Sequence, residues 1–177
     1  GLRLDNAARQ GYDGDSLGAI ELVGAGGCTI SSIFGLRMAL ADIDLANVPI
    51  AIRSGMASLP VLAMLVAIAD EQQIPRKRLT GAVEGDPLRE LVKFGTLRGS
   101  MAMHQRELID MAVFCKRECP GIRPIMVNSH TWHNAGASIT QELAFTLATA
   151  TEYHRLLTAN GFTADEASWA MSFSFSI

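Results

Sequence analysis

The stretch that decides the fold is the polar decad Asn128-Ser129-His130-Thr131-Trp132-His133-Asn134-Ala135-Gly136-Ala137. Residues 122–127, just before it, are mostly apolar, which is typical of a buried strand. After it, apolar residues at spacings of three and four predict one face of a long helix: Ile139, Leu143, Leu147, Ala150 and Tyr153. We therefore predict a polar turn between a strand end and a helix start. Ligands meet α/β proteins at that edge of the sheet, so a functional site is expected there.

The same alternation of strand and helix runs through the rest of the chain. Strands are predicted at residues 48–53, 78–84 and 171–177, and helices at residues 58–73, 86–94 and 101–119. Asp86 is the expected cap of the second of these helices, with Pro87 at its first position. Strands separated by helices favour parallel pairing through right-handed crossovers.

Two α/β architectures fit this order of elements, a doubly wound sheet and a (β/α)8 barrel. A barrel needs about 250 residues, more than the 177 present here. No Gly-x-Gly-x-x-Gly turn follows any predicted strand, which weakens a dinucleotide-binding sheet. We therefore predict a partial (β/α)8 TIM barrel. Residues 1–177 would form a single segment of a longer chain, and this segment lacks the remaining strands of the barrel.

The composition excludes several classes of function. The net charge is −3 and no Lys/Arg cluster occurs, which argues against a nucleic-acid binder. No apolar run approaches the roughly 18 residues of a membrane span. Three cysteines, an odd number, favour reduced thiols and a cytoplasmic location.

Few residues suggest chemistry by their spacing alone. His130 and His133 are three residues apart, but no third ligand is close in sequence, so ordinary hydrogen-bonded histidines are favoured over a metal site. Cys115 and Cys119 lie one helical turn apart and are expected to be packing residues. The residues by themselves thus predict where a site lies, and no mechanism.

Three motifs together carry a family resemblance. They are Gly-Tyr-Asp-Gly-Asp at residues 11–15, Ala-Asp-Glu-Gln-Gln-Ile-Pro at 69–75 followed by Leu-Thr-Gly at 79–81, and Ala-Gly-Ala at 135–137 with Gln-Glu-Leu-Ala-Phe-Thr-Leu-Ala at 141–148. With these motifs the chain resembles, over nearly its whole length, the acyl-CoA-binding barrel of the B12-dependent methylmalonyl-CoA mutases. The resemblance implies a barrel that threads the CoA chain along its axis and interconverts methylmalonyl-CoA and succinyl-CoA. It also implies adenosylcobalamin, held by a domain or subunit outside this segment.

The chain departs from the active members of that family at several substrate contacts. By resemblance, Ala82 and Glu84 replace a Thr and a substrate-binding Gln, and Phe94 replaces a substrate-binding Arg. Thr131 stands at the position of the catalytic His, and Ala170 at that of a further Arg. The remaining candidates for substrate contact are Glu84, His130, Thr131 and Ser172. Only His130 is left as a candidate catalytic residue.

The inward positions of the strands suggest a filled barrel. Alternate strand residues point inward, and active members have small Ser and Thr side chains there. The larger residues expected to fill this barrel are Arg53, Glu84, Met126 and Asn128. Because an inward charge needs a partner, we predict an ion pair between Arg53 and Glu84. The alternative is an Arg53 that reaches the rim and is solvated.

The resemblance is strongest to the small, non-catalytic subunit of heterodimeric mutases. Such a subunit would dock onto a catalytic mutase chain, and the isomerase activity would belong to the complex. One alternative is an active acyl-CoA mutase with altered specificity, in which His130 donates a proton and an acyl-CoA is bound. Another is an unrelated barrel hydrolase or lyase that uses His130 and Glu84.

Overall fold

One parallel sheet organises the protein. The computed structural model describes residues 1–175, and its five strands lie in the order β1-β2-β3-β4-β5. The strands are β1 (Leu2–Arg3), β2 (Ile50–Arg53), β3 (Gly81–Gly85), β4 (Ile122–Asn128) and β5 (Met171–Ser174). Every neighbouring pair is parallel. Since each strand lies beside the next one in the chain, the winding never reverses, as it would in a doubly wound sheet. The predicted partial (β/α)8 barrel is confirmed.

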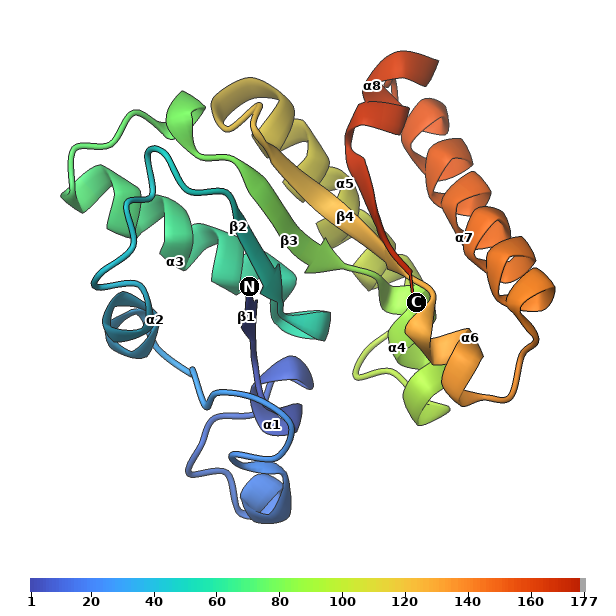
Figure 1. Cartoon of the computed structure of the whole chain (residues 1–177), viewed down its shortest axis with the longest axis horizontal. Coiled ribbons are helices and arrows are strands. Elements are labelled where there is room, and N and C mark those ends of the chain that lie inside the picture. The colour runs from blue at the N-terminus through green and yellow to red at the C-terminus, as the bar shows by residue number, and fades with distance from the viewer. Residues whose placement is uncertain (176–177) are drawn as a thin grey trace.

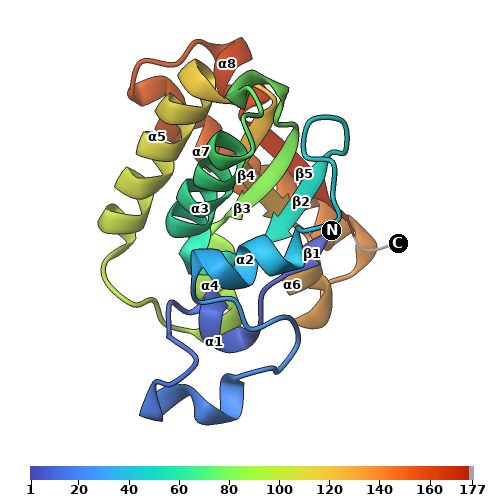
Figure 2. The same cartoon turned by 90° about the vertical axis from the view of Figure 1, so that its left-hand side faces the viewer.

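The helices that cover one face of this sheet each lie in a connection between successive strands (Figures 1 and 2). They are α2 (Ile33–Ala39), α3 (Ser58–Glu71), α5 (Met101–Glu118) and α7 (Ile139–Ala159). Short helices follow the carboxyl ends of three strands, namely α1 (Asn6–Arg9), α4 (Pro87–Phe94) and α6 (His130–Asn134). The remaining elements are α8 (Ala164–Trp169), which leads into β5, and the 3-10 turns η1 (Leu17–Leu22), η2 (Gly55–Ala57) and η3 (Arg76–Arg78).

The core lies between the sheet and these helices. Ile50 and Ile52 of β2 are buried against the helices, whereas Ala51 between them is exposed on the opposite face. One apolar cluster joins β2 and β3 to α3 and α5, and a second joins β4 to α7 and α8. The face opposite the helices is therefore the one that would line a barrel.

Local signals in the sequence begin and end several helices, and those at Asp86 and Pro87 act as predicted. The Asp86 side chain accepts a hydrogen bond from the Arg89 N–H at 3.0 Å, and Pro87 occupies the first turn of α4. Ser138 caps α7 in a capping box with Gln141. After α7, Gly161 adopts a left-handed φ of 89°, which ends the helix.

The buried face of α7 differs from the prediction. Ala150 and Tyr153 are buried as expected, but Ile139 is 84% exposed and Leu147 is 50% exposed. The stripe that faces the sheet consists of Glu142, Thr146, Thr149, Ala150, Tyr153 and Leu157. The threonines tolerate burial because their hydroxyls donate to carbonyls one turn back in α7.

Two boundaries also differ. The decad predicted as a turn contains α6. This helix begins at His130, and only Ser129 separates it from the end of β4. The last predicted strand is β5 over its first four residues, and residues 176 and 177 lie outside the described part of the chain. Within residues 1–175, no helix has the length and apolar character needed to cross a membrane.

Candidate functional site

The candidate site lies at the carboxyl ends of the strands, where short helices gather. The register pairs Arg3 with Arg53 on β1 and β2, and Ile52 with Val83 on β2 and β3. Arg53 and Glu84, the next residues along, therefore come to lie on neighbouring strands at the face away from the helices. This edge is the one at which parallel sheets bind ligands.

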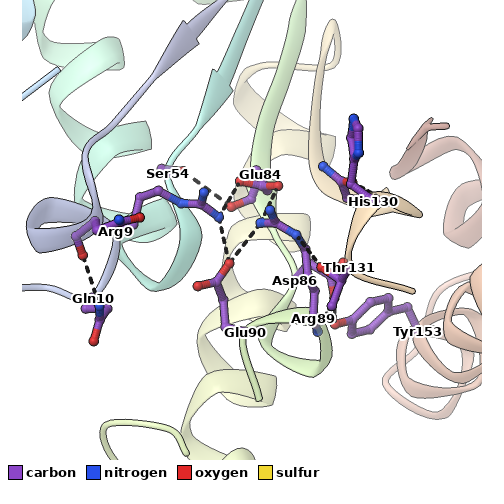
Figure 3. Close-up of polar contacts among 12 residues, drawn as sticks. Arg9, Gln10, Ser54, Glu84, Asp86, Arg89, Glu90, His130, Thr131 and Tyr153 are labelled. Carbon is purple, nitrogen blue, oxygen red and sulfur yellow. Dashed lines mark hydrogen bonds and ion pairs between the residues drawn. The ribbon is translucent and has the colours of Figure 1, made fainter. Parts of the chain in front are cut away.

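A buried cluster of four charges stands beside this edge (Figure 3). Glu84 accepts from Arg89 Nη1 at 2.8 Å and from Arg9 Nη2 at 3.5 Å. Glu90 Oε1 accepts from the same two nitrogens, at 2.8 Å from Arg89 and 2.7 Å from Arg9. The side chains of Arg9 and Glu84 have no exposed surface. Two positive and two negative charges thus neutralise one another in a buried cluster.

The predicted ion pair between Arg53 and Glu84 is wrong. The partners of Glu84 are Arg9 and Arg89, and Arg53 Nη2 instead donates to the Ser174 hydroxyl at 3.2 Å. Arg9 arrives from the segment after β1, and Arg89 from the first turn of α4. Both guanidinium groups contact the Glu84 carboxylate, so its negative charge is already compensated without Arg53.

Thr131 and Ser172 are held by neighbouring groups. The Thr131 hydroxyl is buried and accepts from Arg89 Nε at 3.1 Å, so it is tied to the charge cluster. Ser172 Oγ donates to the Ile125 carbonyl across β4 and β5 at 3.1 Å. Glu84 and Thr131, two of the predicted contact residues, are thus brought together through Arg89.

His130 occupies a different position from these residues. Its backbone N–H donates to Asn128 Oδ1 at 3.0 Å, and its half-buried ring points away from the charge cluster (Figure 3). His133, three residues on, has Nδ1 3.2 Å from Glu142 Oε2 of α7, and Glu142 also accepts from Ser129 Oγ. The two histidines therefore have different surroundings.

Two hollows lie along the inner side of the sheet. One, of about 360 Å³, is lined among others by Ala51, Ala82, Met126 and Ser172. The other, of about 420 Å³, lies at the carboxyl edge and is called here the edge hollow. Its lining residues are Arg3, Arg53, Arg89, Val92, Lys93, Asn128, His130, Thr131, Asn134 and Ala135.

The edge hollow combines predicted and unpredicted residues. Arg53, Asn128, His130 and Thr131 line it as the strand-end argument suggested. Arg3 and Lys93 were missed, since β1 has only two residues and Lys93 lies in the last turn of α4. The rule that polar residues follow strand ends could have pointed to Arg3.

Burial changes the pKa of two groups beside this site. Burial, together with the nearby cations Arg9, Arg89 and Arg3, lowers the pKa of Lys93 to about 8 against the attraction of Glu90. Burial raises the pKa of Asp86 to about 7, although Tyr153 Oη donates to this carboxyl at 2.6 Å.

The edge hollow, of about 420 Å³, is of small-molecule size and is too small to enclose a cofactor as large as cobalamin. Among residues 1–175, no three His, Cys, Asp or Glu side chains are grouped so as to hold a metal ion. The cationic and amide groups of the hollow are suited to anions rather than to metals.

The fold and the position of this edge define a segment of a TIM-barrel protein with a candidate ligand site at the strand ends. The family model for methylmalonyl-CoA mutase matches residues 1–177. This chain belongs to the methylmalonyl-CoA mutase family.

Curated relatives agree with the family assignment. The methylmalonyl-CoA mutase of Cereibacter sphaeroides is 31% identical over 176 residues, which cover 99% of this chain and 25% of that protein. The methylmalonyl-CoA mutase of Rhizobium meliloti is 30% identical, with the same coverage. The methylmalonyl-CoA mutase large subunit of Streptomyces virginiae is also 30% identical, over 24% of its length. This chain therefore spans about a quarter of the length of the relatives it matches.

Proposed function

We propose that this segment belongs to the barrel of an isomerase that interconverts methylmalonyl-CoA and succinyl-CoA, and that its own role is structural. It would act as part of a small subunit that docks onto and stabilises a catalytic mutase chain. The observation that carries the proposal is the engagement of Glu84 and Thr131 by Arg89. By the resemblance set out above, these are two of the positions at which active members are expected to contact substrate.

The cost of releasing these groups supports a structural role. A substrate that took over Glu84 or Thr131 would have to displace Arg89 from a buried cluster. Breaking a buried ion pair costs about 3–5 kcal/mol, because it leaves a charge without compensation. A catalytic site built on Glu84 would carry this cost in every turnover.

The leading alternative is an active acyl-CoA mutase with altered specificity. It is favoured by the edge hollow, which is lined by His130 and by cations that could meet an acidic acyl group. His130 would then donate a proton near the substrate carbonyl. A hydrolase or lyase unrelated to the mutases is not proposed, since family membership excludes it.

The partner and the cofactor belong to the same proposal. Adenosylcobalamin would be held by a domain or subunit outside this segment, and when bound it supplies radical chemistry. The residues of this segment would keep the barrel closed and in register. Reduced thiols at Cys28, Cys115 and Cys119 fit the proposed cytoplasmic location.

Calorimetry with a non-reactive acyl-CoA analogue tests the proposal. The titration uses the full-length parent protein without a partner, and a catalytic mutase chain serves as the positive control. We expect no binding to the parent protein and a stable complex between it and the catalytic chain. Micromolar binding by the parent protein alone would instead support the active mutase.

A further inference from the structure

The edge hollow carries an excess of positive charge. Arg3, Arg53, Arg89 and Lys93 line it, and its lining includes no Asp or Glu. Arg89 is neutralised within the buried cluster by Glu84. Across residues 1–175, no carboxylate forms an ion pair with Arg3, Arg53 or Lys93. Arg53 instead donates to the uncharged Ser174 hydroxyl. Three cations without an ion-paired carboxylate among residues 1–175 therefore share one hollow.

A second observation points independently to a ligand with acceptor atoms. Asn128 is 2% exposed, and its Nδ2 has no hydrogen-bond partner in the described part of the chain. The orientation of the amide is fixed, because Oδ1 accepts from the His130 N–H at 3.0 Å. A buried amide donor without an acceptor is unfavourable, and a ligand oxygen in the hollow would satisfy it.

We propose that the edge hollow binds a compact dianion of the phosphate or sulfate type, held by Arg3, Arg53, Lys93 and Asn128. The donors come from four elements, β1, β2, α4 and β4, and so surround the hollow. A tetrahedral oxyanion presents acceptors in all of these directions, whereas a single carboxylate presents two oxygens in one plane. Guanidinium groups hold such oxyanions through charge-assisted hydrogen bonds. The inference does not depend on whether the segment is catalytic.

The surroundings of Lys93 make this binding sensitive to pH. Its charged neighbours are Arg3 of β1, Arg9 of α1, and Arg89 and Glu90 of α4. With a pKa of about 8 in the free protein, the ammonium is protonated below pH 8 and loses its charge above it. A bound dianion stabilises the protonated form, so affinity falls as the pH rises through 8.

Sulfate is the probe for the test, because its charge stays constant over this pH range. Calorimetric titration of the full-length parent protein at fixed ionic strength is expected to show saturable binding. Asn128→Asp keeps the oxygen that accepts from His130 but adds a negative charge, and should weaken binding about tenfold or more. Arg53→Gln should weaken it similarly. Lys77→Gln, at an exposed position outside the hollow, is the control and should leave affinity unchanged.

Three further measurements complete the test. Thermal unfolding of each variant establishes that it folds. Lys93→Arg should keep the affinity for sulfate but remove its decline between pH 7 and 9. Competition tests the class of ligand: displacement of sulfate by phosphate supports the proposal, whereas displacement by succinate and not by phosphate would overturn it. Absence of saturable binding, or equal binding by the wild type and Asn128→Asp, would overturn the proposal.

Discussion

Glu84 lies between two guanidinium groups with no exposed surface, so its charge depends on both of them. The compensation is incomplete: Arg9 Nε, Arg9 Nη1 and Glu90 Oε2 are buried without a hydrogen-bond partner among residues 1–175. A cluster of this kind gives little net stability over an apolar core, yet it is costly to disrupt. Single substitutions in it should therefore have large effects.

Replacing Glu84 by Ala should lower the free energy of unfolding by about 3–5 kcal/mol, because two buried guanidinium groups lose a carboxylate. Urea unfolding of the full-length protein measures the change. The matched control is Glu71→Ala, which removes an exposed carboxylate 2.8 Å from Arg37 and should cost about 1 kcal/mol or less. Equal effects of the two substitutions would contradict the buried cluster.

Asp86 should make stability depend on pH. Its pKa is about 7 in the folded protein, above the ordinary value of 3.8, so the folded state holds its proton more strongly. The resulting stabilisation is complete below pH 3.8 and is lost as the pH rises through 7. Asp86→Asn keeps the helix cap and removes the titration, so the variant should lose this part of the pH dependence.

Thermal unfolding of the wild type and Asp86→Asn between pH 4 and 8 measures that difference. The Asn side chain can still accept from Tyr153 Oη and from the Arg89 N–H, so the comparison isolates the charge. Parallel curves for the two proteins would show that Asp86 titrates normally.

At the level of secondary-structure elements, the close approach of β3, β4 and α5 depends on a glycine. A Cβ added at Gly85 would lie 2.7 Å from the Pro124 carbonyl oxygen of β4 and 2.6 Å from Leu108 Cδ1 of α5. The first neighbour is backbone and cannot move aside without shifting the strand. β3 can therefore end beside the site only with glycine at this position.

Gly85→Ala should lower the free energy of unfolding by about 1–3 kcal/mol, as expected of overpacking. Gly18→Ala is the control, because a Cβ there meets nothing within 4 Å and its φ is not left-handed. The control should be neutral or slightly stabilising. Denaturant unfolding of both variants makes the comparison, and a neutral Gly85→Ala would mean that β3 and α5 can separate at little cost.

At the level of the whole molecule, the described sheet has one edge without a strand partner. Within residues 1–175, β5 pairs only with β4, whereas the outer side of β1 is partly covered by Cys28, whose N–H donates to the Arg3 carbonyl at 2.8 Å. Unpaired strand edges are templates for association. The apolar stripe of α7, formed by Ile139, Leu143 and Leu147, adds further exposed surface.

Residues 1–177 produced alone should therefore self-associate. Size-exclusion chromatography with light scattering, at several concentrations, is expected to show species larger than the 19.0 kDa monomer. The full-length parent protein under the same conditions is the control. A monodisperse monomer of the segment would contradict the expectation.

The sequence by itself determined the order of strands and helices, because that order depends on local patterns. Apolar runs marked the strands, and Asp86 with Pro87 marked the start of α4. It also located the candidate site, since the carboxyl ends of parallel strands meet at one edge. Motifs of a few residues were enough to identify the family.

Only the tertiary structure decided which side chains meet at that edge. Arg9 and Glu84 are 75 residues apart in the chain. A pattern within a short window of sequence therefore cannot relate them. The same holds for α7, where packing on the sheet buried Thr146 and left Leu147 half exposed. Periodicity marks the apolar residues of a helix, but the face that becomes buried depends on where the helix docks. Contacts distant in sequence are fixed by the geometry of the whole sheet, and that geometry is not local information.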